Sequence, residues 1–166
     1  MIYHGVPNRY SQANSEPKFN KRESFYIYGG TGTGKTYSAC SIINISRENH
    51  AGETDIRLVS VPSLVMDYRN VPFTDKEALI KRYSSGLVIF DDIGAEYQSE
   101  FSQEFILSII DNRWNANVWT GFTSNLSIDE LPYGDRVKSR IAGIARNNIH
   151  QFDGKDKRLE TGEQDK

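Results

Sequence analysis

One stretch of eight residues, Gly29 to Thr36, constrains the fold of this chain more than any other part of its sequence. It reads Gly-Gly-Thr-Gly-Thr-Gly-Lys-Thr and fits the pattern G-x-x-x-x-G-K-[ST] at every fixed position. The run Ser24 to Tyr28 before it is typical of a strand, and residues 35–47 after it have a helical apolar period. A strand, a glycine-rich turn and a helix in this order predict a loop whose backbone amides surround a phosphate group.

The residues of this loop have separate predicted roles. Glycine lets backbone N–H groups approach the β-phosphate without a clash from Cβ atoms. Lys35 is predicted to reach the β- and γ-phosphates, and the Thr36 hydroxyl is predicted to bind Mg²⁺. A solvated lysine on a glycine-rich turn is disfavoured, because both flanking elements match the motif. We therefore expect ATP and Mg²⁺ as cofactors, bound by Gly29, Gly30, Thr31, Gly32, Thr33, Gly34, Lys35, Thr36 and Tyr37.

The rest of the chain alternates short apolar runs with longer segments of helical period, as parallel sheets covered by helices do. We predict strands at 24–28, 55–61 (ended by Pro62), 86–90, 118–123 and 149–152. We predict helices at 35–47, 63–68, 75–83, about 101–114 and 134–145. Together these elements predict an α/β fold, a P-loop NTPase three-layer sandwich with about five parallel strands.

The two ends of the chain differ in composition from its middle. The amino-terminal residues are polar and lack a sustained apolar period, whereas the carboxy-terminal residues are charged and almost free of large apolar side chains. We predict an arm at 1–23, an ATPase core at 24–153 and a charged tail at 154–166. The whole length, 166 residues, suits a single domain.

Composition excludes several classes of protein. Twenty Lys and Arg against 22 Asp and Glu give a net charge of −2, so contact with DNA requires a local patch. The single cysteine, Cys40, cannot form an internal disulfide, which suits a reducing compartment. No apolar run approaches the roughly 20 residues of a membrane-spanning helix, and the first residues do not resemble a signal peptide. We expect a cytoplasmic protein.

Two carboxylates follow the apolar run Leu87–Phe90, at the end of a predicted buried strand. Ligands bind at the carboxyl edge of open α/β sheets, so Asp91 is predicted to hold Mg²⁺ through its water shell. Asp92 is predicted to orient or deprotonate the attacking water. On its own, an apolar run before Asp-Asp is more often a strand entering a turn. The upstream phosphate loop reverses that preference.

Further polar residues fall at the same predicted edge. Asn125 follows the next strand, where its amide could bond the γ-phosphate or the water, although an Asx turn is the plainer alternative. Arg136 and Arg140 are four residues apart and share a helical face, which is often just a solvated basic face. Four aromatic side chains could stack on single-stranded bases, although packing is their commoner fate: Tyr97, Phe101, Trp114 and Trp119.

Five segments together resemble the DnaC/DnaI-type helicase loaders and the related IstB-type transposition ATPases, both of the AAA+ class. They read YGGTGTGKT from Tyr28, VIFDDIGAE from Val88, DNRW from Asp111, TSNL from Thr123 and GDRVKSRI from Gly134. The resemblance covers about Val6 to Arg158 in order and spacing, and GVPNRY from Gly5 is similar to the entry segment before the ATPase core of these loaders.

The resemblance implies roles for individual residues. Asn125 would sense the γ-phosphate, and Arg140 would be an arginine finger that enters the nucleotide site of a neighbouring subunit. The implied catalytic set is Lys35, Asp92, Asn125 and Arg140, with Mg²⁺ held by Thr36 and Asp91. Arg113 and Arg136 would face a subunit interface, and Arg158 matches a closing Gly-x-x-x-Arg pattern. The implied fold is AAA+ / RecA-like. The sequence departs from the family pattern in two ways: only 28 residues precede the phosphate loop, where the loaders usually carry a separate helicase-binding domain, and we expect no full C-terminal lid.

These implications combine into an expected function. The chain would be a Mg²⁺-dependent ATPase that self-associates through its nucleotide edge and loads a DnaB-type replicative helicase onto single-stranded DNA during DNA replication. Its brevity suggests a phage-encoded form. One alternative is an IstB-like transposition ATPase. Another is a nucleotide-dependent binding module without turnover, because Asp92 is one methylene shorter than the glutamate common in AAA+ enzymes. A small P-loop kinase would leave the Asp-Asp-Ile-Gly and Ser-Asn-Leu elements unexplained.

Overall fold

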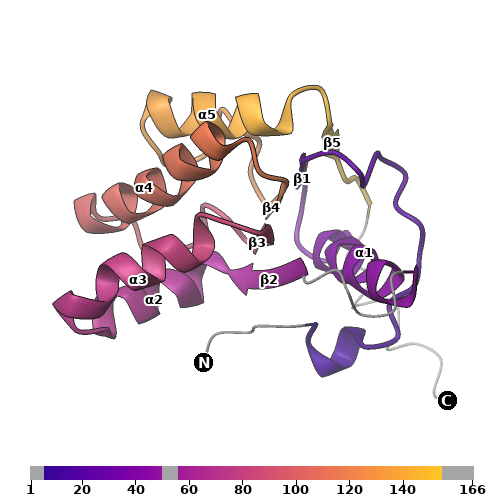
Figure 1. Ribbon diagram of the computed structural model, residues 1–166. Coiled ribbons are helices and arrows are strands. Elements are labelled where there is room, and N and C mark those ends of the chain that lie inside the picture. The colour runs from indigo at the N-terminus through magenta and orange to yellow at the C-terminus, as the bar shows by residue number, and fades with distance from the viewer. Residues whose placement is uncertain (1–5, 50–55, 155–166) are drawn as a thin grey trace, which may run out of the picture.

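The computed structural model describes residues 6–49 and 56–154 and forms a parallel sheet covered by helices on both faces (Figure 1). The strands are β1 (Phe25–Tyr28), β2 (Ile56–Ser60), β3 (Leu87–Asp91), β4 (Thr120–Ser124) and β5 (Ile149–Gln151). The helices are the 3-10 turn η1 (Asn8–Tyr10), α1 (Lys35–Asn49), α2 (Val61–Asn70), α3 (Phe73–Tyr83), α4 (Glu100–Ala116) and α5 (Asp135–Ala145). The predicted α/β class is therefore confirmed.

The five strands lie in the order β2-β3-β4-β1-β5 and every neighbouring pair is parallel. Tyr28, the last residue of β1, pairs with Ser124 of β4, and Phe90 of β3 pairs with Phe122 of β4. Because the strands are parallel and in this register, β1, β3 and β4 end at one edge of the sheet. The phosphate loop, the Asp-Asp pair and the residues after β4 therefore meet at that edge.

Alternating side chains of the strands build a core on each face of the sheet. Phe25 and Ile27 of β1 pack with α1 on one face, while Tyr26 packs with α2 to α5 on the other. Figure 1 shows α1 on one side of the sheet and α4 and α5 on the opposite side. Both faces of the central strands are buried, which accounts for the nearly continuous apolar runs in their sequence.

Helix α2 begins two residues earlier than the sequence predicts. It starts at Val61, directly after β2, and Pro62 lies in its first turn rather than before it. The first turn of a helix tolerates proline, because its N–H groups have no partner within the helix. Pro62 therefore marks the start of α2, and the expectation that it separates a strand from a later helix is wrong.

Residues 6–23, predicted as an arm, pack against the core. The Asn44 side-chain amide of α1 donates hydrogen bonds to three arm carbonyls, those of Tyr10, Ser11 and Ala13, at 3.1, 3.3 and 2.8 Å. The ring of Phe19 lies 4.9 Å from that of Phe25, and both side chains are buried. This segment is thus part of the α1 face. Almost all of the predicted tail lies outside the described residues.

None of the helices within residues 6–49 and 56–154 has the length and apolarity needed to cross a membrane.

Candidate functional site

The phosphate loop connects the end of β1 to the first turn of α1. Gly29, Gly32 and Gly34 have φ angles of 147°, 76° and 96°, which favour glycine. A Cβ atom on Gly29 would lie 2.1 Å from the carbonyl oxygen of Phe152, so only glycine fits between β1 and the chain after β5. The loop therefore curls tightly onto the N-terminus of α1, as a phosphate cradle requires.

Lys35 is the first residue of α1, and its side chain is buried within this loop. Its ammonium donates hydrogen bonds to the carbonyl oxygens of Gly29 and Gly30, both at 2.7 Å. These bonds hold a positive charge inside the curl of the loop, beside the positive end of the helix dipole. The arrangement suits a polyanionic ligand.

Asp91, the last residue of β3, lies beside the hydroxyls of Thr36 and Thr123. The Thr36 hydroxyl donates to Oδ1 and Oδ2 of Asp91 at 3.1 and 3.3 Å, and the Thr123 hydroxyl donates to Oδ1 at 2.6 Å. Burial, followed by repulsion from Asp92, raises the pKa of Asp91 to about 6. A carboxylate next to a threonine hydroxyl is a hard oxygen donor set.

This donor set fits Mg²⁺. Magnesium commonly keeps several water ligands and binds one or two protein oxygens together with phosphate oxygens. Within the described ranges, no three His, Cys, Asp or Glu side chains gather into a metal site, so a wholly protein-built metal cage is not formed there. The residues that would hold the ion beside a nucleotide are Thr36 and Asp91.

Asp92 follows in a left-handed conformation, with φ of 58°. Its backbone N–H donates to the Thr123 hydroxyl oxygen at 3.0 Å, so one threonine contacts both members of the Asp-Asp pair. Thr123 was not among the residues predicted for the site. The available signal was its place at the end of the strand next to β3, since Phe90 pairs with Phe122 one position earlier.

Asn125 lies directly after β4 and is exposed at the same edge of the sheet. The preceding residue fixes this turn: the Ser124 hydroxyl donates to the carbonyl of Ile93 at 2.6 Å and accepts the N–H of Leu126 at 3.1 Å. The turn after β4 is thereby tied to the turn after β3. A sensing role for Asn125 stays a prediction.

A buried carboxylate that the sequence analysis missed connects the turn after Asp92 to the segment before α5. Glu96 accepts a hydrogen bond from the Tyr133 hydroxyl through Oε1 and from the N–H of Gly94 through Oε2, the latter at 3.0 Å. Burial and the Glu96 carboxylate both raise the pKa of Tyr133, which therefore remains a donor. Tyr133 precedes Gly134, the residue that caps α5.

The two arginines of α5 share one partner on α4. Nε of Arg140 lies 3.2 Å from Oδ1 of Asp111, and Nη2 of Arg136 forms an ion pair with Oδ2 of the same carboxylate. The guanidinium carbon of Arg140 lies 5.0 Å from the centre of the Trp114 ring. The side chain of Arg136 is 66% exposed and that of Arg140 is 33% exposed. Both residues are at the surface, and an interface role for either stays a prediction.

Arg113 corrects the sequence analysis, which placed it at an interface. Its exposed fraction is 0%, and its guanidinium donates to the Thr120 hydroxyl and to the carbonyls of Tyr83, Ser85, Gly86 and Trp119. Burial, and then repulsion from Arg57, lowers the pKa of Arg113 to about 10. The expected interface role is wrong, because Arg113 joins α4 to the α3–β3 turn inside the molecule.

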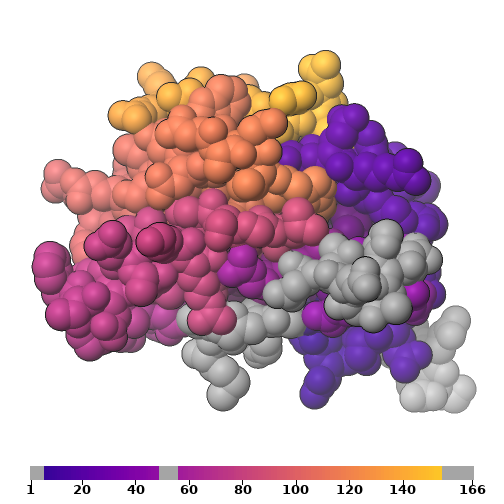
Figure 2. Space-filling model, in the orientation of Figure 1, coloured from indigo at the N-terminus to yellow at the C-terminus, as the bar shows by residue number. Residues whose placement is uncertain are grey.

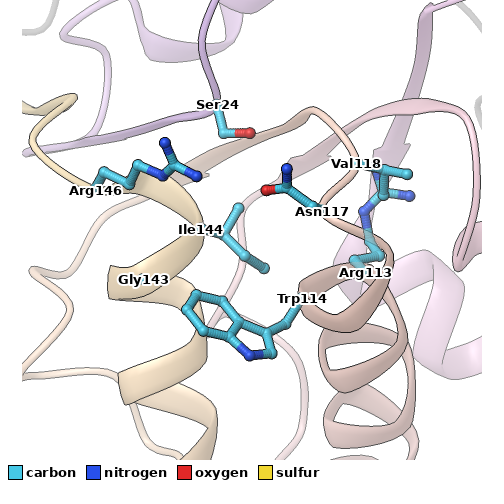
Figure 3. Close-up of a pocket in the computed structure, with 8 residues that line it drawn as sticks. All are labelled: Ser24, Arg113, Trp114, Asn117, Val118, Gly143, Ile144 and Arg146. Atoms are coloured by element: carbon cyan, nitrogen blue, oxygen red, sulfur yellow. The ribbon is translucent and has the colours of Figure 1, made fainter.

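A surface hollow of about 260 Å³ lies at the other end of the sheet (Figure 3). Ser24, Val118 and Arg146 line it, and they precede β1, β4 and β5 respectively, at the amino ends of the strands. The phosphate loop and the Asp-Asp pair are at the carboxyl ends. This hollow is therefore separate from the candidate nucleotide site.

The order of the parallel strands, with the phosphate loop after β1 and two carboxylates after β3, defines a P-loop NTPase fold of the AAA+ class. The chain is 30% identical over 116 residues to the replicative helicase loader DnaI of Bacillus subtilis, and this match covers 68% of the chain and 36% of that protein. It is 27% identical over 121 residues to the replicative helicase loader DnaC of Escherichia coli K12, which covers 71% of the chain and 49% of that protein. The resemblance to DnaC/DnaI-type loaders is confirmed.

Solved structures of similar proteins share this fold. The crystal structure of DnaI superposes with a TM-score of 0.64 at 25% identity, covering 89% of this chain and 80% of that one. The replication initiator DnaA bound to AMPPCP and single-stranded DNA shares the fold, with a TM-score of 0.71 at 16% identity, covering 90% and 51%. The search against family models found no match. The chain spans about a third to half the length of the two curated relatives.

Proposed function

We propose that this chain is the ATPase core of a helicase loader: it binds ATP with Mg²⁺, self-associates through its nucleotide edge and acts on a DnaB-type replicative helicase and single-stranded DNA. The observation that carries the proposal is the convergence of Lys35, Thr36 and Asp91 at one sheet edge, in a chain similar to two helicase loaders.

The residues at this edge have separate roles in nucleotide hydrolysis. Bound Mg²⁺ neutralises phosphate charge and orients the phosphate chain. Lys35 contributes a buried positive charge within the loop, and Thr36 and Asp91 hold the ion. Asp92 and Asn125, on adjacent turns, orient the attacking water, and Asp92 accepts its proton. AMPPCP, an ATP analogue, is bound by the structural neighbour DnaA, which supports ATP as the ligand of this fold.

Turnover requires a second subunit because Arg140 is held away from its own loop. Its contacts within the described part of the chain are to Asp111 and Trp114 of α4, not to the phosphate loop. An arginine that stabilises the transferred phosphoryl group is worth roughly 10³ to 10⁵ in rate. ATP would therefore hold two subunits together, and hydrolysis would release them.

Single-stranded DNA would contact the α2–α3 end of the molecule, coloured magenta in Figure 2, despite the negative net charge of the chain. Phe73 and Tyr97 are 89% and 73% exposed there. The guanidinium carbon of Arg69 lies 5.2 Å from the Tyr97 ring, and Nζ of Lys76 lies 4.4 Å from the Phe101 ring. Tyr97, an exposed ring beside the Arg69 cation, together with the exposed Phe73, suits base stacking along a phosphate backbone.

The deciding experiment measures ATP turnover per subunit against protein concentration, with and without single-stranded DNA, for the wild type and Arg140→Ala. We expect the wild-type rate to rise with concentration and DNA, and the Arg140→Ala rate to collapse. A flat rate that ignores Arg140 would contradict subunit-dependent turnover. ATP binding without any turnover would favour a nucleotide-dependent binding module.

A second measurement identifies the partner. We expect the ATP-bound wild type to co-elute with a DnaB-type helicase hexamer in gel filtration, and Lys35→Ala to elute separately. Co-elution with an IstB-associated transposase and not with the helicase would replace the loader proposal by the transposition ATPase.

A further inference from the structure

Asp111 is the only carboxylate among the described residues that contacts the arginines of α5, and it contacts both. Its two oxygens are divided between them, with Oδ2 on Arg136 and Oδ1 on Arg140. One negative charge against two positive charges leaves this cluster with a net positive charge. The ion pairs therefore do not neutralise the cluster, and it can still attract an anion.

The contact to Arg140 uses only part of its guanidinium. Nε bonds Asp111 at 3.2 Å, while neither Nη nitrogen of Arg140 hydrogen-bonds to a residue within 6–49 or 56–154. The two Nη nitrogens form the fork that matches two phosphate oxygens. Asp111 thus holds the side of the guanidinium that points back along the side chain and leaves the phosphate-binding side available.

The ring of Trp114 contacts the guanidinium of the same side chain, Arg140. Trp114 lies three residues after Asp111, on the same side of α4, and its ring centre is 5.0 Å from the Arg140 guanidinium carbon. The ring also lies against α5 at Gly143, where a Cβ atom would come within 2.3 Å of Cζ3 (Figure 3). The indole is 37% exposed, and its contacts are with α5 at Gly143 and with the Arg140 guanidinium.

We propose that Asp111 and Trp114 are positioning residues that preset the Arg140 guanidinium for the γ-phosphate of a neighbouring subunit. This inference rests on the proposed function, in which Arg140 acts across the interface. A free arginine side chain occupies many rotamers, and ordering it opposes each productive encounter. Holding Nε and one face of the guanidinium before assembly removes most of that cost. Arg136 keeps the second carboxylate oxygen occupied, so that Asp111 does not rotate toward both Nη nitrogens of Arg140.

The test compares Asp111→Asn with Arg140→Ala and with Glu104→Gln, a matched control on the exposed side of α4. Turnover is measured at saturating ATP and protein, ATP affinity by equilibrium titration, and folding by thermal melting. We expect Asp111→Asn to lower turnover about tenfold, against roughly a thousandfold for Arg140→Ala. ATP affinity should be unchanged in both, and Glu104→Gln should match the wild type.

Mixing variants shows which subunit carries the defect. Lys35→Ala subunits cannot bind ATP but keep an intact Arg140 cluster, so adding them to Asp111→Asn subunits should restore turnover at the mixed interfaces. Adding Arg140→Ala subunits instead should restore nothing. A mixture of Lys35→Ala with Asp111→Asn that stays inactive would overturn the proposal, because the defect would then lie in the variant's own nucleotide site.

Different outcomes contradict the positioning role of Asp111 and the proposed function on which it rests. Wild-type turnover in Asp111→Asn, together with a collapse in Arg140→Ala, would overturn the positioning role and leave the subunit-dependent ATPase intact. Wild-type turnover in Arg140→Ala would overturn the proposed function itself. Should Asp111→Asn melt below the assay temperature, Trp114→Phe replaces it, since it keeps an aromatic ring and weakens the contact with the guanidinium. We expect Trp114→Phe to lower turnover several-fold. An unchanged turnover would overturn the positioning role.

Discussion

The Thr123 hydroxyl lies 2.6 Å from Oδ1 of Asp91 and donates a hydrogen bond to it across two adjacent strands. The same hydroxyl oxygen accepts the backbone N–H of Asp92 at 3.0 Å. Thr123 therefore fixes the carboxylate that would hold Mg²⁺ together with the turn that carries the proposed water-orienting residue. Its hydrogen bond also lowers the pKa of Asp91, against the larger effect of burial.

Thr123→Val removes this hydroxyl while keeping the shape of the side chain. The pKa of Asp91 should then rise above 6, so a larger share of the carboxyl group is protonated near neutral pH. We expect Mg²⁺-dependent ATP affinity to fall about tenfold at pH 6.5 and less at pH 8.5. Titration of a fluorescent ATP analogue at both pH values measures this. Thr123→Ser should behave as the wild type, and an equal loss at both pH values would contradict the account.

Asp92→Asn should separate binding from hydrolysis. Asparagine tolerates the left-handed conformation that Asp92 adopts at φ of 58°, so the turn should persist. The amide cannot accept the proton of the attacking water. We expect ATP affinity within about twofold of the wild type and turnover lower by roughly 10² to 10⁴. Lys35→Ala is the contrasting variant, with binding lost. Equal loss of ATP affinity in both variants would refute the division of roles.

Asp91→Asn should stabilise the nucleotide-free protein at neutral pH. The folded state raises the pKa of Asp91 from 3.8 to about 6, so it favours the protonated form. The stabilisation linked to that proton is complete below pH 4 and is lost as the pH rises through 6. The amide of the substituted side chain does not ionise, so the variant does not lose stability as the pH rises. We therefore expect the free energy of unfolding of Asp91→Asn to exceed that of the wild type by about 1 to 3 kcal/mol at pH 7.5.

Urea denaturation at pH 4 and pH 7.5, with a metal chelator present, tests this expectation. The gain from Asp91→Asn should be well below about 1 kcal/mol at pH 4, because the wild-type carboxyl group is then almost fully protonated in the folded state and already partly protonated in the unfolded state, whose pKa is 3.8. A gain of the same size at both pH values would show that the effect arises from packing and not from ionisation.

Arg113→Met should destabilise the fold severely. The substitution keeps an unbranched side chain but leaves the Thr120 hydroxyl and four backbone carbonyls without the donor they share. We expect a loss of about 3 to 5 kcal/mol in the free energy of unfolding. Arg136→Met, at an exposed ion pair, should cost below about 1 kcal/mol. Urea denaturation of both variants measures the difference, and similar small losses would contradict the structural role of Arg113.

Local sequence signals predicted the elements well, because each strand and helix has its own periodicity. The phosphate loop carried the strongest signal, since Gly29, Lys35 and Thr36 are fixed by one local turn. The boundary at Val61 was missed because proline in a first turn has the same sequence signature as proline that ends a strand.

Contacts between distant parts of the chain were not predictable in the same way. The hydrogen bond from Thr123 to Asp91 depends on the register of β3 against β4, which no local pattern specifies. The bond between Tyr133 and Glu96 depends on how two loops meet. Arg113 was misplaced because helical periodicity does not tell whether a guanidinium reaches water or a set of buried carbonyls.

The packing of the segment before β1 redefines where the folding unit begins. Ala13 and Phe19 belong to the same buried cluster as Phe25 and Ile43, and Asn44 holds the backbone of this segment in place. A fragment cut at Ser24, where the composition changes, would keep every nucleotide-binding motif and still expose an apolar face of α1 to water. Expression boundaries chosen from the motifs alone would therefore yield an aggregation-prone protein from a chain whose catalytic residues are all present.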